Sequence, residues 1–309
     1  MKKFYRIITL ITIVFCTLTA FSPAEARQKK MKALIVSGQN NHNWQVSHRV
    51  LRLILAQSEL FDVDIMLTPS QGGDMSAFNP EFEGYDVVVL DYNGDRWPAA
   101  ADSAFIDYVR KGGGVIIYHA ADNAFAEWDE FNRIIALGGW EGRNENSGPY
   151  YYLVDGVPVL DESPGPGGSH GSQREYPMNC RDLEHPIVKG LPQIWMHARD
   201  EMYDRMRGPA NIKDLLYSGY ADASKGGSGR EEPLVFTVDY GKARILHIMI
   251  GHCGPTAEDN PAMQCAGFQT LLLRGAEWAA TGKVTQDVPS DFPTADAVSL
   301  RPDYIAPEK

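Results

Sequence analysis

The chain has 309 residues, of which 44% are hydrophobic and 22% are charged, and its formal net charge at pH 7 is −11. This acidic balance argues against nucleic acid and anionic membranes as partners, and it is compatible with a neutral substrate such as a sugar. The length fits one large α/β domain or two small ones, and we expect one domain with long insertions.

The first 26 residues have the pattern of a secretory signal peptide. Three basic residues precede an apolar run over residues 7–21, and Ala24 and Ala26 provide the small residues of a cleavage site. We therefore expect cleavage after Ala26 and a protein that is periplasmic or secreted. The apolar run is shorter than the ~20 residues of a membrane span, and no later segment approaches that length, so no span is predicted.

Strands and helices alternate over the first half of the remaining chain. The apolar residues 115–118 lie between a run of glycines and the polar His119, which indicates a short buried strand. Apolar residues at near-helical spacing indicate helices in the same way. We expect strands at 32–37, 61–67, 86–90 and 115–118, and helices at 45–58, 99–110 and 125–137. This order is typical of parallel crossovers and predicts an α/β fold with a mostly parallel, doubly wound sheet.

The composition changes between residues 138 and 171, which are rich in aromatic residues, glycine and proline. Long loops in compact domains are usually functional or disordered, and the tyrosines here favour order, so we predict a lid or specificity loop. Regular structure then returns, with strands expected at 195–203, 214–218, 234–238 and 243–250 and a helix at 267–281. The domain would span residues 27–283, and a proline-rich tail over 284–309 would pack as coil.

Three histidines share one topological position, directly after a predicted strand. His42 follows the first strand, His119 the fourth and His252 the last. Because parallel strands open their carboxyl ends at the same edge of a sheet, we expect these side chains to converge. Neutral imidazoles at that edge would bind a divalent metal, or one would act as acid and base near neutral pH. The alternative is a purely structural role for each histidine.

Carboxylates near these histidines would serve either chemistry. Asp91 and Asp122 follow predicted strands and are candidate metal ligands. Asp200 and Glu201 are adjacent on a predicted strand and therefore face opposite ways, so only one of them points into any site. A surface ion pair is the other interpretation of this acidic pair.

The remaining histidines differ in their surroundings. His170 lies among small residues in GGSHGS, from which it can bend over a pocket. His185 precedes a proline, which favours an extended or turn conformation. His197 and His247 fall within predicted strands and are assigned to the core.

Large aromatic residues fall in the predicted loops, namely Trp44, Trp97, Trp140 and the run 150–152 that includes Tyr151. Sugar rings stack on aromatic faces, so several of these side chains around one cleft would form a carbohydrate platform. As buried anchors they would instead hold the loops in place. A nucleotide site is disfavoured, because GQNNHNW stands after the first strand where a phosphate-binding glycine motif would be needed.

Three cysteines follow the leader, Cys180, Cys253 and Cys265. In an oxidising compartment, a bridge between Cys253 and Cys265 would close a short ring worth roughly 3 kcal/mol in the loop-entropy model. We predict this bridge, with Cys180 as the leftover thiol. No CxxC or Cys/His spacing supports a zinc finger.

Several segments, taken together, resemble the ThuA-like (trehalose-utilisation) family. In chain order they are SGQNNHNW, GGGVIIYHAADN, HPIVKGLP, DEMY, GKARILHIMIGH and GFQTLLLRGAEWAATGK. The resemblance covers nearly the whole chain after the leader. It implies a flavodoxin-like three-layer sandwich similar to class I glutamine amidotransferases, although a shared fold does not transfer activity.

The comparison with those amidotransferases is informative at residues 112–123. They place a nucleophilic cysteine on the turn after this strand, and this chain has His119 there. Cys253 lies one residue past His252 and is not at that turn. Without a thiol the acyl-enzyme route is closed, so we do not expect glutaminase activity.

The resemblance implies carbohydrate metabolism, in a family associated with disaccharide use and with 3-keto sugars. The matching site positions are His42, His119, Glu201 and His252, followed by Asp122 and His170. We expect an enzyme, a lyase, isomerase or hydrolase, that uses His119, His252, Glu201 and Asp122 for acid–base chemistry on a small carbohydrate. A divalent metal on the histidines could assist, although this chemistry requires no cofactor. The alternative is a carbohydrate-binding or partner-binding module without catalysis.

Overall fold

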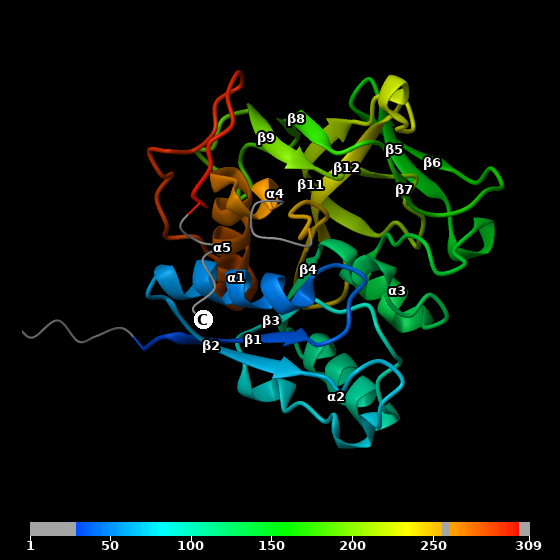
Figure 1. Ribbon diagram of the computed structural model, residues 1–309, viewed down its shortest axis with the longest axis vertical. Helices are drawn as coiled ribbons and strands as arrows, with labels where there is room; N and C mark the ends of the chain where they lie inside the picture. Colours follow the sequence, from blue (N-terminus) through cyan, green and yellow to red (C-terminus); the bar gives the residue numbers. More distant parts are fainter. Residues whose placement is uncertain (1–28, 255–259, 303–309) are drawn as a thin grey trace, which may run out of the picture.

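A mixed central sheet organises the fold, as the computed structural model shows for residues 29–254 and 260–302 (Figure 1). Its parallel strands are β1 (Met31–Ser37), β2 (Phe61–Leu67), β3 (Val87–Leu90), β4 (Gly114–Tyr118) and β13 (Arg244–Ile248). They lie in the order β2-β1-β3-β4-β13. The predicted signal peptide lies outside the described residues.

Antiparallel strands continue the sheet beyond β13. They are β12 (Glu231–Val238), β11 (Ile212–Tyr220), β8 (Arg174–Cys180) and β9 (Ile194–Asp200), in that order. A hairpin of β5 (Tyr150–Val154) and β6 (Val157–Asp161) joins at β12. A separate two-stranded sheet pairs β7 (Ser169–His170) with β10 (Tyr203–Asp204). This small sheet places His170 opposite Tyr203.

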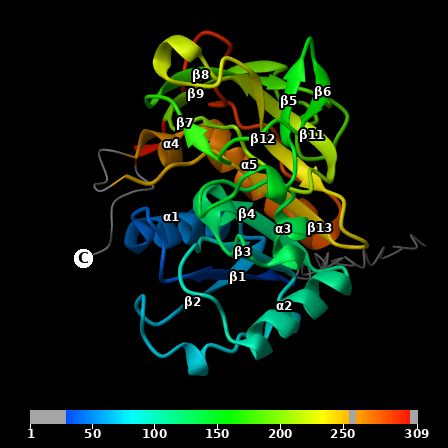
Figure 2. The same cartoon turned by 90° about the vertical axis from the view of Figure 1, so that its right-hand side faces the viewer.

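Alternate residues of a strand point to opposite faces of the sheet, so apolar side chains lie on both faces of the parallel strands. Helices cover both of these faces. The helices are α1 (Trp44–Gln57), α2 (Ala99–Arg110), α3 (Asp129–Ile135), α4 (Pro261–Gln264) and α5 (Ala266–Thr281). Ile35 of β1 packs in a cluster with α1 and α5, whereas Val36 packs in a second cluster with α2 and α3. Figure 2 shows α1 and α2 on opposite sides of these strands. Burial of a side chain such as Phe105 contributes roughly 1.5–3 kcal/mol.

The predicted α/β class is confirmed, and the four N-terminal strands lie within one residue of the predicted bounds. The predicted sheet is right in its parallel part. Strands were also predicted near β9, β11 and β12, but their antiparallel pairing was not, and β5, β6 and β8 lay in segments with no predicted strand. The helix predicted at 125–137 is shorter, because Phe125 and Ala136 have positive φ and only α3 between them is helical.

The segment predicted as a lid loop is more ordered than expected. Its tyrosine run forms β5, whose residue Tyr151 is buried in the core together with α2 and α3. Beyond it, Gly167, Gly168 and His170 lie against the turn at Trp140, and the N–H of Trp140 donates to the carbonyl of Gly167 over 2.8 Å. The end of this segment is thus held against the body of the domain.

Gly251 lies shortly after β13, and its backbone has a conformation that requires glycine. Its φ is +105°, and a Cβ there would lie 2.5 Å from Cε2 of Phe268. The close approach of α5 therefore fixes the turn that carries His252. The described part of the tail lies along the sheet end, where Phe292 packs on Trp195. None of the described helices is both long and apolar enough to cross a membrane.

Candidate functional site

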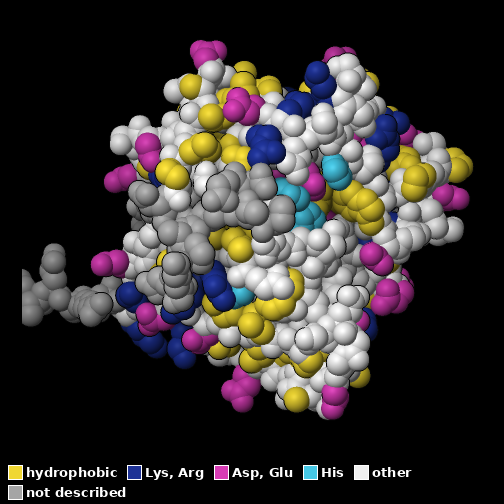
Figure 3. Space-filling view, viewed as in Figure 1, with side chains coloured by type: hydrophobic (Ala, Val, Ile, Leu, Met, Phe, Trp, Pro, Cys, Tyr) yellow, Lys and Arg dark blue, Asp and Glu magenta, His cyan; other side chains and the backbone are white. Residues whose placement is uncertain are grey.

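A pocket of about 580 Å³ opens at the carboxyl ends of the parallel strands. Histidine side chains reach the surface together near the centre of this face (Figure 3). The lining comes from the loops after β1, β3 and β4, from the small sheet β7–β10, and from Trp140 and Glu201. The pocket therefore lies where ligands bind in open α/β sheets.

His42 and Glu201, which line this pocket, form a cluster with His119 and His252, which lie next to them and outside the lining. One nitrogen of each ring and one carboxylate oxygen all lie within 4.8 Å of one another. Glu201 Oε2 is 3.6 Å from His42 Nε2, 3.8 Å from His119 Nε2 and 3.3 Å from His252 Nδ1. The predicted convergence of the three histidines is confirmed.

The topology explains this meeting of distant residues. β4 lies between β3 and β13, so the loops after β1, β4 and β13 open at one edge. Glu201 arrives from the other half of the sheet, directly after β9. His119 has a φ of +44°, which is unusual for a residue with a side chain and is a form of strain that clusters at functional sites.

His119 presents an unprotonated nitrogen to the cluster. Its Nδ1 is 2.7 Å from the carbonyl oxygen of Met249, which can only accept, so Nδ1 carries the proton. Nε2 is then left with its lone pair and lies 3.1 Å from the hydroxyl of Tyr203. Burial, and then the nearby His42, lower the pKa of His119 to about 3. The ring is therefore neutral.

His42 is oriented by two amide side chains from its own loop. Its Nδ1 lies 3.3 Å from Asn40 Oδ1 and 3.1 Å from Asn41 Oδ1, so Nδ1 donates and Nε2 faces Glu201. Asn40 in turn donates to Asp91 over 3.2 Å. Hydrogen bonds of this kind behind a histidine fix the ring orientation in metal sites.

Glu201 and His252 form the charged part of the cluster. Burial alone would raise the pKa of Glu201, but His252, His42 and His119 outweigh it and hold this pKa well below its usual range. Burial alone would lower the pKa of His252, and Glu201 outweighs it, so this pKa is raised. Nδ1 of His252 is buried and lies 3.3 Å from Glu201 Oε2, but no described residue bonds to it in hydrogen-bond geometry.

Asp200 holds the backbone that carries both of these residues. Its carboxylate accepts from the N–H groups of Glu201, Gly251 and His252 over 2.7, 2.7 and 3.1 Å. It also lies 2.7 Å from His197 Nε2. Burial would raise the pKa of Asp200, but these contacts, led by His197, lower it. Asp200 thus joins the ends of β9 and β13.

The donor set of the cluster fits a divalent cation. Three imidazole nitrogens and one carboxylate oxygen converge. The other nitrogen of His42 and of His119 donates a hydrogen bond to an oxygen outside the cluster. His252 likewise turns a buried nitrogen, Nδ1, toward Glu201. Imidazole and carboxylate ligands suit zinc and other transition metals.

A second wall of the pocket consists of His170, Tyr203 and Trp140. Tyr203 stacks on His119 with ring centroids 4.5 Å apart, and Trp140 meets Tyr203 edge-on at 4.8 Å. His170 Nδ1 donates to the carbonyl of Gly171 over 2.8 Å, which leaves Nε2 free and 3.8 Å from Glu201 Oε1. His170 is the most exposed histidine here, with 38% of its side chain accessible.

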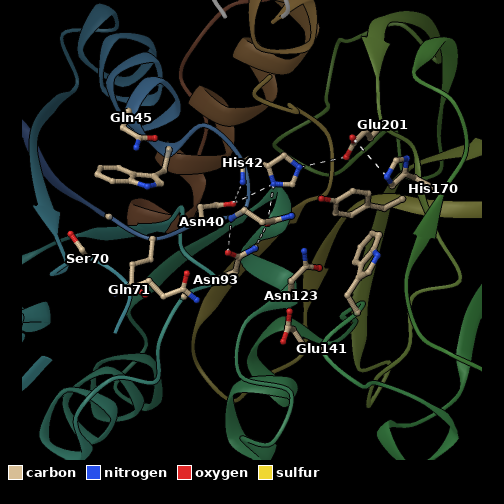
Figure 4. Close-up of a pocket in the computed structure, with 17 residues that line it drawn as sticks. Asn40, His42, Gln45, Ser70, Gln71, Asn93, Asn123, Glu141, His170 and Glu201 are labelled. Atoms are coloured by element: carbon tan, nitrogen blue, oxygen red, sulfur yellow. Dashed lines mark hydrogen bonds and ion pairs between the residues drawn. The ribbon is translucent and has the colours of Figure 1, made fainter. Parts of the chain in front are cut away.

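The opposite end of the pocket is lined by neutral polar groups. Figure 4 shows Gln45, Ser70 and Gln71 on the far side of His42 from Glu201. Trp44, Gln39 and Asn93 also line it, and no Lys or Arg is among the lining residues in the described part of the chain. This lining offers hydrogen bonds to an uncharged ligand and, among its described residues, no cationic side chain of Lys or Arg.

The structure corrects several predicted site residues. Trp97 is 3% exposed and packs on Phe78, Phe82 and Phe105, so it is a core residue and not part of a sugar platform. Tyr151, 7% exposed, is likewise in the core. Trp44, Trp140 and His170 do line the pocket.

Two carboxylates are also misplaced by the prediction. Asp122 is fully buried behind the pocket, with Oδ2 3.2 Å from His247 Nε2, and so cannot touch a substrate. Asp91 is not a ligand either, because Ser37, Ser47 and Asn40 donate to it. Burial raises the pKa of Asp91 to about 7.

The predicted bridge between Cys253 and Cys265 is wrong, because both are free buried thiols. Cys253 lies against the carbonyl of Asn43, and Cys265 lies beside His197 at the start of α5, so they belong to different contacts. Burial raises the pKa of Cys253 to about 12, which makes it a poor nucleophile.

Sequence reasoning gave no role to Tyr203, Asn40 or Asn123 and did not identify Asp200 as a support. The amide-rich run GQNNHNW was the available signal for Asn40, since amides beside a histidine can orient its ring. Asn123 lines the pocket and its buried Oδ1 has no partner. No pattern in the sequence indicates that Tyr203, Asn40 and Asn123 lie near one another.

Comparison with known proteins places these features in a family. The ThuA family model, described as trehalose utilisation, matches residues 32–279. A ThuA-like protein from Parabacteroides merdae ATCC 43184 is 66% identical over 90% of this chain and 100% of its own, with a TM-score of 0.88. A ThuA-like protein from Bacteroides uniformis ATCC 8492 shares the fold at 20% identity, over 85% of this chain and 97% of its own, with a TM-score of 0.53. No curated protein matches the chain.

Proposed function

Since the chain belongs to the ThuA family, which is linked to trehalose utilisation, we propose that it is an enzyme that transforms a neutral disaccharide or 3-keto-glycoside. The observation that carries this proposal is the convergence of His42, His119, His252 and Glu201 within 4.8 Å, at the wall of a pocket that His42 and Glu201 line. These four residues would hold a divalent cation. A neutral, hydroxyl-rich substrate matches a pocket lined by amides and tryptophans without Lys or Arg among its described residues.

A keto sugar is suited to such a centre, because the hydrogens beside its carbonyl group are acidic. A bound divalent cation acts as a Lewis acid that polarises a carbonyl oxygen. The protein supplies the other requirement, a base at the rim. His170 lines the pocket, is the most exposed of its histidines, and keeps the lone pair of Nε2 available when Nδ1 donates to Gly171, so we assign it the proton transfer from carbon.

The remaining pocket residues would bind and orient the substrate. Trp140 and Trp44 both line the pocket and offer faces for sugar rings. Such contacts hold a substrate in one orientation and thereby lower the entropic cost of the reaction.

Glutaminase chemistry is not part of the proposal. His119 occupies the strained turn after β4 at which related folds place a nucleophilic cysteine. Cys253 is 2% exposed, and burial raises the pKa of its thiol to about 12. A thiol that does not ionise near neutral pH is not an activated nucleophile.

We also propose that the protein acts in the periplasm or outside the cell. The basic, apolar and small-residue pattern of residues 1–26 supports this. Cell fractionation with N-terminal sequencing tests it. A chain that starts at Arg27 in the periplasmic or secreted fraction is the expected result, and an intact Met1 in the cytoplasm would contradict it.

A carbohydrate-binding module without catalysis is the second candidate. The observation that favours it is the pairing of Trp44 and Trp140 with a neutral amide lining, which suffices for binding alone. In that case the histidine cluster would be structural. Sugar binding would then survive replacement of His119.

One experiment separates these functions. The purified protein is incubated with disaccharides and their 3-keto derivatives, with and without added Zn²⁺ or Mn²⁺ and with and without chelator. We expect turnover that chelation abolishes and that His119→Ala removes, while His185→Ala, outside the pocket, retains it. Binding without turnover would support the second candidate. Neither binding nor turnover with any sugar would refute the carbohydrate assignment.

A further inference from the structure

We infer that Tyr203 is a catalytic hydrogen-bond donor that stabilises the negative charge developing on a substrate oxygen at the histidine cluster. The inference rests on the proposed function and adds a group that the cation-binding residues do not include. Its basis is the position of the phenol hydroxyl, 3.1 Å from Nε2 of His119 and on the pocket wall beside Glu201.

Tyr203 is held in a fixed orientation by its neighbours. Its ring stacks on His119 at 4.5 Å, Trp140 meets it edge-on at 4.8 Å, and β10 pairs it with His170. Only 1% of the residue is exposed. A donor fixed in this way needs little reorganisation when charge develops, which is the condition for electrostatic stabilisation of a transition state.

The direction of the hydroxyl proton follows from the hydrogen bonds of His119. Nδ1 of His119 donates to the carbonyl of Met249, so its Nε2 accepts and the Tyr203 hydroxyl donates. Nε2 is also the atom that faces Glu201 in the cluster. When Nε2 of His119 binds a cation, the hydroxyl of Tyr203 no longer has this nitrogen as its acceptor. Its hydrogen is then directed to the reacting oxygen of the substrate.

The phenol acts as a donor and keeps its proton. A phenol has an ordinary pKa of about 10 and so keeps its proton near neutral pH. In its hydrogen bond with His119 the phenol is the donor, because Nε2 of His119 has no proton to give. It can donate a hydrogen bond to an oxyanion, as other buried acids do in enolising enzymes.

The step it assists is proton abstraction beside a carbonyl group. His170 takes the proton from carbon, the electron pair of that C–H bond forms a carbon–carbon double bond, and the carbonyl oxygen gains the negative charge. Tyr203 donates its O–H to this oxygen without transfer of the proton. Return of the proton from His170 to the same carbon restores the ketone. Its return to the former carbonyl carbon, while the proton of the neighbouring hydroxyl passes to the former carbonyl oxygen, moves the carbonyl group by one position. Neither course needs an oxidant or reductant.

Few other described groups can fill this role. The pocket lining includes no Lys or Arg in the described residues, and Asn123 is the other neutral donor near Tyr203. His42, His119 and His252 use their inward nitrogens in the cluster. The phenol is therefore a pocket-lining donor within hydrogen-bond distance of the cluster that is not itself one of its four members.

The test uses Co²⁺, a visible substitute for spectroscopically silent cations, and acetohydroxamate, a small oxyanion that binds such centres. Wild type, Tyr203→Phe and the control Tyr151→Phe are each titrated with Co²⁺ and then with acetohydroxamate, followed by absorption. A hydrogen bond to a charged group corresponds to about ten- to hundredfold in affinity. We expect Tyr203→Phe to lose that much acetohydroxamate affinity with unchanged Co²⁺ affinity, and Tyr151→Phe to match wild type.

Each result decides between the two proposals. Equal acetohydroxamate affinity in wild type and Tyr203→Phe overturns the role of Tyr203 and leaves the cation centre standing. Loss of Co²⁺ affinity in Tyr203→Phe shows a structural role and also overturns it. Absence of Co²⁺ binding in wild type refutes the centre itself, and with it the inference. With a 3-keto-glycoside as substrate, Tyr203→Phe should lower kcat and leave KM nearly unchanged.

Discussion

Asp200 and His252 are 52 residues apart in the chain, yet the backbone N–H of His252 donates to the Asp200 carboxylate over 3.1 Å. The same carboxylate accepts from the N–H of Glu201. A single buried side chain therefore sets the positions of two members of the cluster. Asp200 does not itself reach the pocket, since it is fully buried.

Replacement of Asp200 by Asn should weaken cation binding while the four candidate ligands stay in place. An amide cannot accept all the hydrogen bonds that the carboxylate accepts from backbone and His197. Changes behind metal ligands cost about 10–100-fold in affinity. Calorimetry with Zn²⁺ measures this, and circular dichroism confirms folding. Wild-type affinity in a folded Asp200→Asn protein would show that Asp200 has no positioning role.

Replacement of Glu201 by Gln should weaken cation binding more than any change behind the ligands, by over about 100-fold. The variant removes the only carboxylate of the cluster and keeps its shape. His185→Asn is the matched control, because His185 packs on Trp278 away from the pocket. If both variants bind Zn²⁺ like wild type, the cluster is not a cation site.

Cation binding should weaken as the pH falls. His252 has a raised pKa, so below that value its Nδ1 is protonated and cannot act as a ligand. Affinity should therefore rise with pH and level off above the raised pKa. NMR titration of the metal-free protein measures the cause directly. The pKa of His252 should lie above 6.5 in wild type and fall in Glu201→Gln. A pKa unaffected by that variant would contradict the electrostatic explanation.

Replacement of Gly168 by Ala should destabilise the protein and disturb His170. Gly168 has a φ of +83°, and an added Cβ would lie 2.6 Å from the Cα of Gly139. Gly72→Ala is the matched control, with a φ of +74° and nothing within 4 Å of the new atom. Both variants cost about 1–3 kcal/mol of backbone strain, and only Gly168→Ala adds a clash. Thermal unfolding should show the larger loss for Gly168→Ala. Equal losses would mean that the contact with Gly139 relaxes freely.

The histidine positions were predictable from sequence for a physical reason. His42, His119 and His252 each follow a parallel strand, and the carboxyl ends of parallel strands lie at one edge whatever loops follow. Glu201 could not be placed this way. Strand alternation indicated only that one of Asp200 and Glu201 points into a site, and the family resemblance pointed to Glu201. Both lie at the end of antiparallel β9, whose place in the sheet no local pattern reveals.

The aromatic residues show why the rest was out of reach. Trp44 and Trp97 both lie in or next to segments read as loops, yet Trp44 lines the pocket and Trp97 packs among phenylalanines. The difference depends on α2 and the 3₁₀ turn Phe82–Gly84, which bring Phe105 and Phe82 onto Trp97. Likewise, the close spacing of Cys253 and Cys265 in sequence does not reveal that their thiols contact different groups. Such contacts exist only in the assembled core.

The four members of the cluster come from the two halves of the sheet, with three histidines after parallel strands and Glu201 after antiparallel β9. The parallel and antiparallel halves of the sheet meet where β13 pairs with β12. A cation held by all four residues would be an additional cross-link between these halves. Mechanical separation of the two halves would then have to break metal–ligand bonds together with the sheet. The occupied protein should consequently unfold as one unit, even under a force applied across the junction of β12 and β13.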